Sequence, residues 1–285
     1  MGTDFEAQVR ATNDKINART GRPLVAAIAV GLVLGLGLLF SLIFVKAIFM
    51  LYALPLVTFT AIEHASALRF AGREVPRLPK VVTAVAIIPA AFYWGAVGHW
   101  LVALGGFVLV AVWRTAELVR RSHRTSAAAF FKDLAAGAFI QSYVVLLASF
   151  TVLLTAQPGG EWWTLAFLIV VISIDTGAYA SGLLFGKHPM APVISPKKTW
   201  EGFAGAVIVA LTAAVLLGIF MLHEPWWVGL ILGATLIVTA TMGDLAESLI
   251  KRDLGIKDIS TWLPGHGGFL DRLDSVLPSA AAAYA

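Results

Sequence analysis

The sequence contains no cysteine, and only 13% of its 285 residues are charged. The absence of thiols excludes disulfides, thiolate catalysis and cysteine-based zinc sites. Hydrophobic residues make up 59% of the chain, whereas a soluble domain holds roughly 45–50%. A water-soluble globular fold is therefore excluded, and the sequence predicts an integral membrane protein.

Uncharged runs that are long enough to cross a bilayer support this prediction. Residues 24–45 hold no charge and exceed the ~18 residues that indicate a transmembrane helix. The same run is longer than the ~7–15 residue core of a signal peptide, so we expect a retained first span. Further spans are predicted at 47–62, 81–98, 99–113, 134–155, 162–180, 203–222 and 226–243, and a ninth would begin near 273.

The expected fold is all-α, a polytopic membrane protein with about eight or nine transmembrane helices. We divide the chain into three parts by composition. Residues 1–23 form a cytoplasmic N-terminal segment, and residues 24–160 form N-terminal transmembrane helices. Residues 161–285 form a transmembrane region whose cytoplasmic loops carry the polar motifs, and we expect catalysis there.

The distribution of Lys and Arg predicts the orientation. If the N-terminus is cytoplasmic, 20 of the 21 Lys and Arg residues fall in cytoplasmic segments, and Lys46 is the exception. This bias follows the positive-inside rule. The cytoplasmic segments would be 1–23, 63–80, 114–133, 181–202 and 244–272.

The end of the last long span carries polar residues at helical spacing. Four of them fall at offsets 0, 3, 4 and 7 and would share one face of a helix: Asp244, Glu247, Ser248 and Lys251. Such a face could bind a ligand. It could equally be a solvated helix end with a salt bridge from Glu247 to Lys251.

The stretch LPGHGGFLDRLD, residues 263–274, combines glycines with charges. The glycines around His266 let the backbone bend sharply and approach a ligand closely. Asp271 and Asp274 would share a face if this stretch is helical. Carboxylates suit Mg²⁺, which is usually held by one or two of them together with substrate phosphates. The neighbouring cations suit a polyphosphate.

Two further polar features lie in the same half of the chain. Lys197 and Lys198 follow a Ser-Pro turn and could grip phosphate, although excess lysine in a cytoplasmic loop also fits topology alone. Asp175 follows an uncharged run, and an ionisable residue at membrane depth indicates function. The alternative is that the span ends there and leaves Asp175 in water. Together the motifs indicate a metal-dependent reaction on a phosphate compound at the cytoplasmic surface.

The region from Ser248 to Asp274 resembles the signature of the phosphatidate cytidylyltransferases (CDP-diacylglycerol synthases). That signature reads S-x-x-K-R-x4-K-D, a short spacer, then H-G-G-x-x-D-R-x-D. The stretches DTGAYASGLLFGK and ISPKKTWEG also resemble the family, so the similarity covers roughly residues 170–275. The fixed positions are all matched, by Ser248, Lys251, Arg252, Lys257, Asp258, His266, Gly267, Gly268, Asp271, Arg272 and Asp274.

The resemblance implies a reaction in phospholipid biosynthesis. Phosphatidic acid would attack the α-phosphorus of CTP and give CDP-diacylglycerol and pyrophosphate. It also implies Mg²⁺, a second cation such as K⁺, membrane lipids as partners, no nucleic acid, and a homodimer. The expected location is a bacterial plasma membrane, with the active site facing the cytoplasm.

The resemblance also implies roles for individual residues. Asp244 and Asp271 are the first candidates for metal ligands, and Glu247, Asp274 and Asp175 are secondary ones. His266 would either contact phosphate or brace the glycine turn. The expected catalytic cations are Lys197, Lys198, Lys251, Arg252, Lys257 and Arg272, and the expected substrate-binding residues are Ser195, Pro196, Ser248, Gly267 and Gly268.

Other functions make different demands on the sequence. A CDP-alcohol phosphatidyltransferase would carry a D-G-x2-A-R…G-x3-D-x3-D pattern, which this sequence lacks. A CTP-dependent lipid-alcohol kinase would transfer the terminal phosphoryl group and release CDP. A transporter of phosphorylated anions would bury charges in mid-span between paired broken helices. A non-catalytic scaffold would not need the complete motif.

The C-terminus departs from the expected pattern. Eleven residues follow Asp274, whereas a helix needs ~20 to cross the bilayer. Because this stretch also contains Pro278, we expect the last span to be truncated or only half inserted.

Overall fold

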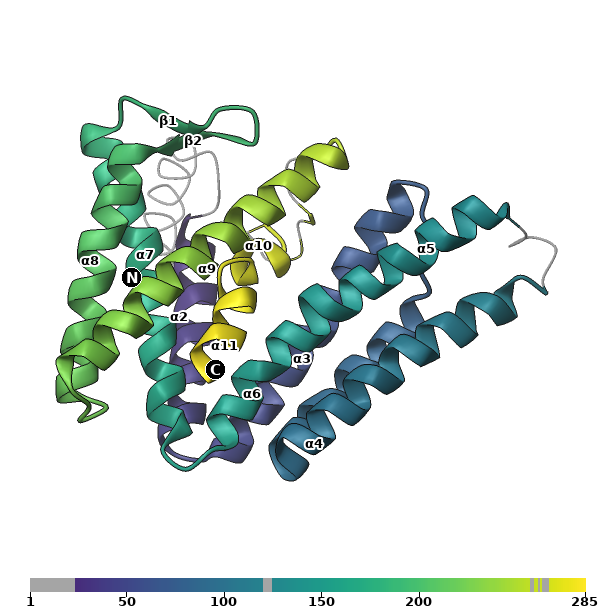
Figure 1. Cartoon of the computed structure of the whole chain (residues 1–285), viewed down its shortest axis with the longest axis horizontal. Coiled ribbons are helices and arrows are strands. Elements are labelled where there is room, and N and C mark those ends of the chain that lie inside the picture. Colours follow the sequence, from purple (N-terminus) through teal and green to yellow (C-terminus); the bar gives the residue numbers. More distant parts are fainter. Residues whose placement is uncertain (1–23, 120–124, 257–258, 261, 263–266) are drawn as a thin grey trace, which may run out of the picture.

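The computed structural model of the chain describes residues 24–119, 125–256, 259–260, 262 and 267–285, and these are predominantly helical (Figure 1). Within these ranges one short β-hairpin interrupts the helices. In chain order the elements are α2 (Leu24–Ile43), α3 (Lys46–Phe70), α4 (Arg77–Glu117), α5 (Ala127–Ile140), the π-helix η2 (Gln141–Leu146), α6 (Leu147–Ala156), α7 (Gly160–Phe185), β1 (Pro189–Ala191), β2 (Ser195–Thr199), α8 (Trp200–Phe220), α9 (Trp226–Asp253), α10 (Leu270–Leu273) and α11 (Val276–Tyr284).

Six helical segments within the described residues are long and apolar enough to cross a membrane. They confirm the predicted all-α polytopic membrane fold. Large apolar side chains such as Leu101, Leu183 and Ile208 are exposed on their outer faces, as expected where lipid surrounds a bundle. The six segments are α3, α4, the continuous run Ala127–Ala156, α7, α8 and α9.

Two apolar clusters hold the bundle together. One lies mainly between α3, α4 and α6, where Val57, Ile87 and Val152 are buried. The other lies among α7, α8 and α9, where small residues such as Ala210 and Ala214 allow the helices to approach closely. Close packing of α7, α8 and α9 gives a rigid base for the side chains at their ends.

The boundary predicted between spans 81–98 and 99–113 is wrong. The structure places the break at Gly95, whose φ of 57° and ψ of −144° are non-helical. A Cβ on Gly106 would meet the side chain of Thr83, so the two parts of α4 lie against each other. Glycine permits this reversal because it has no Cβ to clash at positive φ.

Three spans run further than predicted, because polar residues continue the helices beyond the apolar runs. Helix α3 extends to Phe70 rather than 62, and α9 to Asp253 rather than 243. Helix α7 continues to Phe185, well past Asp175. The helix itself therefore does not end at Asp175.

The C-terminal residues form a short helix rather than a full span. Helix α11 has nine residues, too few to cross the bilayer core, which takes ~20. Leu277, Ser279 and Ala280 are buried, and the helix packs against α6 and α9. A Cβ on Gly243 would lie 2.7 Å from Pro278, so this glycine lets α11 lie close to α9.

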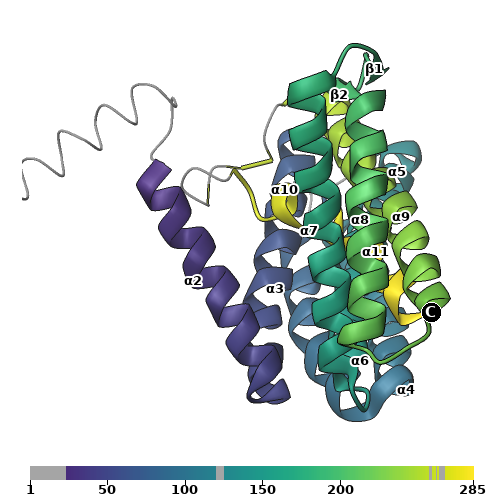
Figure 2. The same cartoon turned by 90° about the vertical axis from the view of Figure 1, so that its left-hand side faces the viewer.

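The connections predicted to be cytoplasmic gather at one end of the molecule. The hairpin β1–β2 and the C-terminal ends of α3 and α9 lie there (Figures 1 and 2). The opposite end holds the turns before α3, α7 and α9. Lys46, which falls outside the predicted cytoplasmic segments, lies at this opposite end. There it forms an ion pair with Glu161 at 2.5 Å.

Candidate functional site

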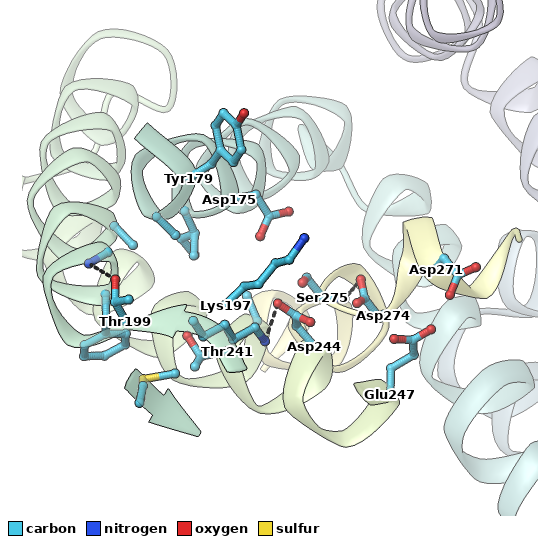
Figure 3. Close-up of a pocket in the computed structure, with 18 of the residues that line it drawn as sticks. Asp175, Tyr179, Lys197, Thr199, Thr241, Asp244, Glu247, Asp271, Asp274 and Ser275 are labelled. Carbon is cyan, nitrogen blue, oxygen red and sulfur yellow. Dashed lines mark hydrogen bonds and ion pairs between the residues drawn. The ribbon is translucent and has the colours of Figure 1, made fainter. Parts of the chain in front are cut away.

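A pocket of about 480 Å³ opens where the ends of α7, α8 and α9 meet the hairpin (Figure 3). Its volume lies within the ~300–1,000 Å³ range of small-molecule sites. Strand β2 and the segment from Asp271 to Ser275 complete the wall. The pocket is lined by carboxylates and by cationic side chains together.

Helix α9 supplies one acidic wall. Asp244, Glu247 and Lys251, three of the four residues of the predicted helix face, line the pocket. Lys251 lies between two carboxylates, with its Nζ 2.6 Å from Glu247 and 3.1 Å from Asp271. Glu247 is only 1% exposed. One ammonium thus faces two carboxyl groups and holds α9 close to the Asp271 side chain.

The hairpin brings two lysines over this wall. Lys198 pairs with Asp244 at 2.5 Å, and Figure 3 shows the Lys197 ammonium reaching into the cavity. Thr199 begins α8 by accepting a hydrogen bond from Gly202 N–H at 3.1 Å. This cap satisfies an otherwise unpaired amide at the helix start and fixes the direction in which the lysines enter.

A second carboxylate holds the base of the hairpin. Glu201, in the first turn of α8, accepts hydrogen bonds from the backbone amides of Lys187 and His188 at 3.1 and 3.2 Å. Its other oxygen lies 2.5 Å from His188 Nδ1. Glu201 therefore ties both ends of the hairpin together and keeps β2 against the pocket.

Helix α7 supplies the opposite wall. Asp175 points into the cavity from this helix, across from Asp244 (Figure 3). Tyr179, one turn further on, also lines the pocket. The carboxylates therefore surround the cavity instead of forming one patch.

Asp271 and Asp274, which line the pocket from the C-terminal part of the chain, have pKa shifts in opposite directions. Burial opposes ionisation of Asp271, but hydrogen bonds with Glu247, with Gly268 N–H and with Lys251 outweigh it and hold the pKa below its usual range. Burial, reinforced by the charge of Asp244, raises the pKa of Asp274 to about 7. Asp271 is thus an anion at neutral pH, whereas a cation bound nearby would help Asp274 to ionise.

Gly267 and Gly268, the two described glycines of the motif, shape the backbone and do not line the pocket. Gly267 has a φ of +80°, a conformation that glycine adopts without strain. Gly268 donates its N–H to Asp271 Oδ2 at 2.7 Å. A Cβ on Gly268 would overlap the carboxylate of Glu63, so no larger residue fits there.

The structure brings nine of the predicted site residues together and leaves six described ones outside the lining. Arg252 lies outside because its Nε donates to Ile194 O at 3.1 Å, which ties α9 to the hairpin. Predicted Lys257, Asp258 and His266 lie outside the described residues. The nine in the lining are Asp175, Lys197, Lys198, Asp244, Glu247, Lys251, Asp271, Arg272 and Asp274, and the six outside it are Ser195, Pro196, Ser248, Arg252, Gly267 and Gly268.

Sequence reasoning missed several residues of the site. Ser275 and Thr241 line the pocket, yet isolated small hydroxyl residues give no signal of their own. Glu63 contacts the motif from the N-terminal half of the chain. The sequence does single out Glu63, because it is the one acidic residue in α3. An ionisable residue within a membrane helix indicates function.

The donor set fits an open Mg²⁺ site. Among the described residues, no three carboxylate or histidine side chains are grouped closely enough to enclose a metal ion. Mg²⁺ does not need such a cage, since one or two carboxylates and the substrate phosphates usually hold it. The Asp244 carboxylate at the pocket wall, with Asp274 beside it in Figure 3, provides this type of ligand.

Comparison with known proteins agrees with the chemistry of the pocket. The profile described as "Cytidylyltransferase family" matches residues 25–285. A protein of Mycobacterium bovis named phosphatidate cytidylyltransferase is 41% identical over 273 residues, which cover 94% of this chain and 89% of the relative. One of Mycobacterium leprae with the same name is 39% identical over 282 residues, covering 95% of this chain and 89% of the relative. A Staphylococcus epidermidis protein of that name is 44% identical over 124 residues, or 43% of this chain and 47% of the relative.

Proposed function

This chain belongs to the cytidylyltransferase family, and we propose that it transfers the cytidylyl group of CTP to phosphatidic acid. The products are CDP-diacylglycerol, a precursor in phospholipid biosynthesis, and pyrophosphate. The name of the mycobacterial relatives supports this function. The observation that carries it is a pocket of mixed carboxylates and cations at the end of a membrane-spanning bundle.

The reaction is a nucleotidyl transfer between two anions. A phosphate oxygen of phosphatidic acid attacks the α-phosphorus of CTP and forms the new P–O bond. The bond from the α-phosphorus to the bridging oxygen breaks, and pyrophosphate leaves with the electron pair. Because the attacking oxygen is already ionised, no strong general base is needed. Positioning and charge neutralisation do most of the work in such transfers.

The cationic side chains of the pocket reduce the repulsion between the two substrates. Lys197 reaches into the cavity, and Arg272 lines the wall. Both can donate hydrogen bonds to phosphate oxygens and to the departing pyrophosphate. Lys198 and Lys251 hold the acidic wall in place through their ion pairs with Asp244 and Asp271.

The carboxylates would hold the cation. Asp244 and Asp271 are the proposed primary ligands, with Asp274, Glu247 and Asp175 as secondary ones. Mg²⁺ supplies charge neutralisation and orientation of phosphate oxygens when bound. A second cation such as K⁺ is part of the same proposal.

The proposal also sets the orientation and assembly. The N-terminus and the pocket face the cytoplasm of a bacterial cell, where CTP is available, and the chain crosses the plasma membrane about eight times, since α11 is too short for a ninth span. The positive-inside charge pattern supports this orientation, as does the gathering of these connections at one end of the bundle. The acyl chains of the lipid stay in the bilayer, and the enzyme acts as a homodimer.

The test is transfer of label from CTP to lipid by purified protein in detergent. CTP labelled at the α-phosphorus and CTP labelled at the γ-phosphorus are each incubated with phosphatidic acid, with Mg²⁺ or with EDTA. We expect α-label in CDP-diacylglycerol with Mg²⁺, none with EDTA, and none with Asp271→Asn. Transfer of the γ-label to a lipid would instead indicate a kinase. A folded wild type that transfers neither label would contradict the proposal.

A further inference from the structure

Glu63 is a buried carboxylate for which the proposed chemistry gives no role. It lies near the C-terminal end of α3 and is only 1% exposed. Burying a carboxylate is unfavourable unless its oxygens are paired. The partners of Glu63 therefore indicate why it is there.

Within the described residues, three hydrogen bonds to Glu63 come from the segment that leads into the pocket. Oε1 accepts the Phe269 N–H at 3.1 Å, and Oε2 accepts the Leu270 N–H at 2.8 Å. The hydroxyl of Ser260 also donates to Oε1. These donors lie 197 to 207 residues away from Glu63 in the sequence.

Asp271 holds the neighbouring amide of the same segment. Its Oδ2 accepts the Gly268 N–H at 2.7 Å. Three consecutive amides, at 268, 269 and 270, are thus held by two carboxylates, one from α3 and one from the pocket. The Asp271 Oδ1 in turn lies 3.1 Å from Lys251, so the position of this backbone determines how Asp271 meets the pocket.

The surroundings of Glu63 allow the segment little freedom. Phe59, one turn earlier on α3, stacks on Phe269 with the ring centroids 5.5 Å apart. Trp262 meets the edge of both rings. Gly268 has no space for a side chain, because Glu63 occupies it. Helix α3 therefore holds residues 268–270 by two adjacent turns.

We propose that Glu63 is a positioning residue for the pocket: by binding the amides of Phe269 and Leu270, it sets the Asp271 carboxylate in place. This inference rests on the proposed function, in which Asp271 is a metal ligand. It gives the N-terminal helices a part in the reaction besides anchoring the chain in the membrane. Partners that orient metal ligands typically change metal affinity or activity by about 10–100-fold when altered.

Glu63→Gln tests the inference with little change in shape. The amide nitrogen of Gln cannot accept a hydrogen bond, so one of the two backbone amides would face a donor. We expect the Mg²⁺ concentration for half-maximal activity to rise by about 10-fold or more. The KM for phosphatidic acid should change little. Glu63→Asp, which keeps the charge on a shorter arm, should recover part of the loss.

The measurement is CDP-diacylglycerol formation against Mg²⁺ concentration, together with the unfolding midpoint in detergent. Thr60→Val is the matched control, because Thr60 is equally buried on α3 and its hydroxyl bonds to Leu56 O at 2.7 Å within the helix. Its Mg²⁺ dependence should equal that of the wild type.

The outcomes separate the two proposals. If the wild type forms no CDP-diacylglycerol, the proposed function fails. If the wild type is active and Glu63→Gln shows an unchanged Mg²⁺ dependence, the inference is overturned. The same conclusion follows if Glu63→Gln only lowers the unfolding midpoint and the amount of active enzyme, because a purely structural role predicts that result.

Discussion

At the scale of single residues, the pocket depends on how each charge is paired. Lys198 forms an ion pair with Asp244 at 2.5 Å, and Lys251 forms ion pairs with Glu247 and Asp271. Lys197 instead reaches into the cavity (Figure 3). Both lysines line the pocket, but Lys198 ends against Asp244 whereas Lys197 reaches further into the open space. The same side-chain chemistry thus serves two purposes, support of the acidic wall and contact with a substrate.

This difference predicts different effects of removing each lysine. Lys197→Met should lower kcat/KM for CTP on the order of 10²-fold, as expected when a donor to developing negative charge is lost, with an unchanged unfolding midpoint. Lys198→Met should lower activity and also the unfolding midpoint, because it leaves Asp244 unpaired. Steady-state kinetics measures kcat/KM for each variant, and thermal unfolding in detergent measures its unfolding midpoint. Lys187→Met, outside the pocket lining, is the control; a similar loss there would contradict this assignment.

At the scale of elements, helix ends decide where the chemistry lies. The polar turns that extend α7 and α9 beyond their apolar runs carry Asp175, Asp244, Glu247 and Lys251 into the pocket. The β-hairpin closes the pocket because Thr199 and Glu201 fix its two ends on α8. In the other half of the bundle, the position of α4 depends on a single glycine. Gly95 alone within α4 has a non-helical conformation.

The reversal at Gly95 predicts a site-specific loss of stability. Gly95→Ala places a Cβ at a φ of 57° and a ψ of −144°, which should cost about 1–3 kcal/mol in the free energy of unfolding. Gly105→Ala, at an open helical position where a Cβ meets nothing within 4 Å, should leave stability unchanged or slightly raised. Unfolding of both variants in SDS measures the difference. Equal midpoints would show that the turn does not need glycine.

At the scale of the whole molecule, polar and apolar surfaces are arranged along the bundle axis, with polar residues at the ends and apolar residues on the sides. The pocket and the hairpin lie at one end, and the short turns before α3, α7 and α9 lie at the other. The exposed sides between them are apolar. A lipid substrate can then remain in the bilayer while its headgroup meets a water-soluble nucleotide at the pocket. This requires that the pocket end faces the cytoplasm.

Because the chain has no cysteine, single introduced cysteines can test this orientation. Glu224→Cys lies in the turn before α9, and Thr125→Cys lies just before α5 at the other end. In intact cells a membrane-impermeant maleimide should label Glu224→Cys, and should label Thr125→Cys only after the membrane is permeabilised. The reverse pattern would place the pocket outside the cell. The cysteine-free chain provides the blank.

The amino-acid sequence by itself determined the class of protein, most of its spans and the chemistry of its site. Apolar runs of bilayer length can be read locally, because each helix satisfies its own backbone in lipid. The face of Asp244, Glu247 and Lys251 was also predictable, since helical spacing is local. The signature between Ser248 and Asp274 indicated the reaction before any contact was known.

Only the tertiary structure decided which motif residues meet. Ser248 and Arg252 belong to the signature, yet they lie outside the pocket lining, whereas Asp175 faces Asp244 across it. Glu63 reaches the motif from 206 residues away. No local pattern encodes such a contact, because it depends on how α3 packs against residues 268–270. The physical reason is that spacing along the chain fixes neighbours on one helix, but packing between helices fixes neighbours across the bundle.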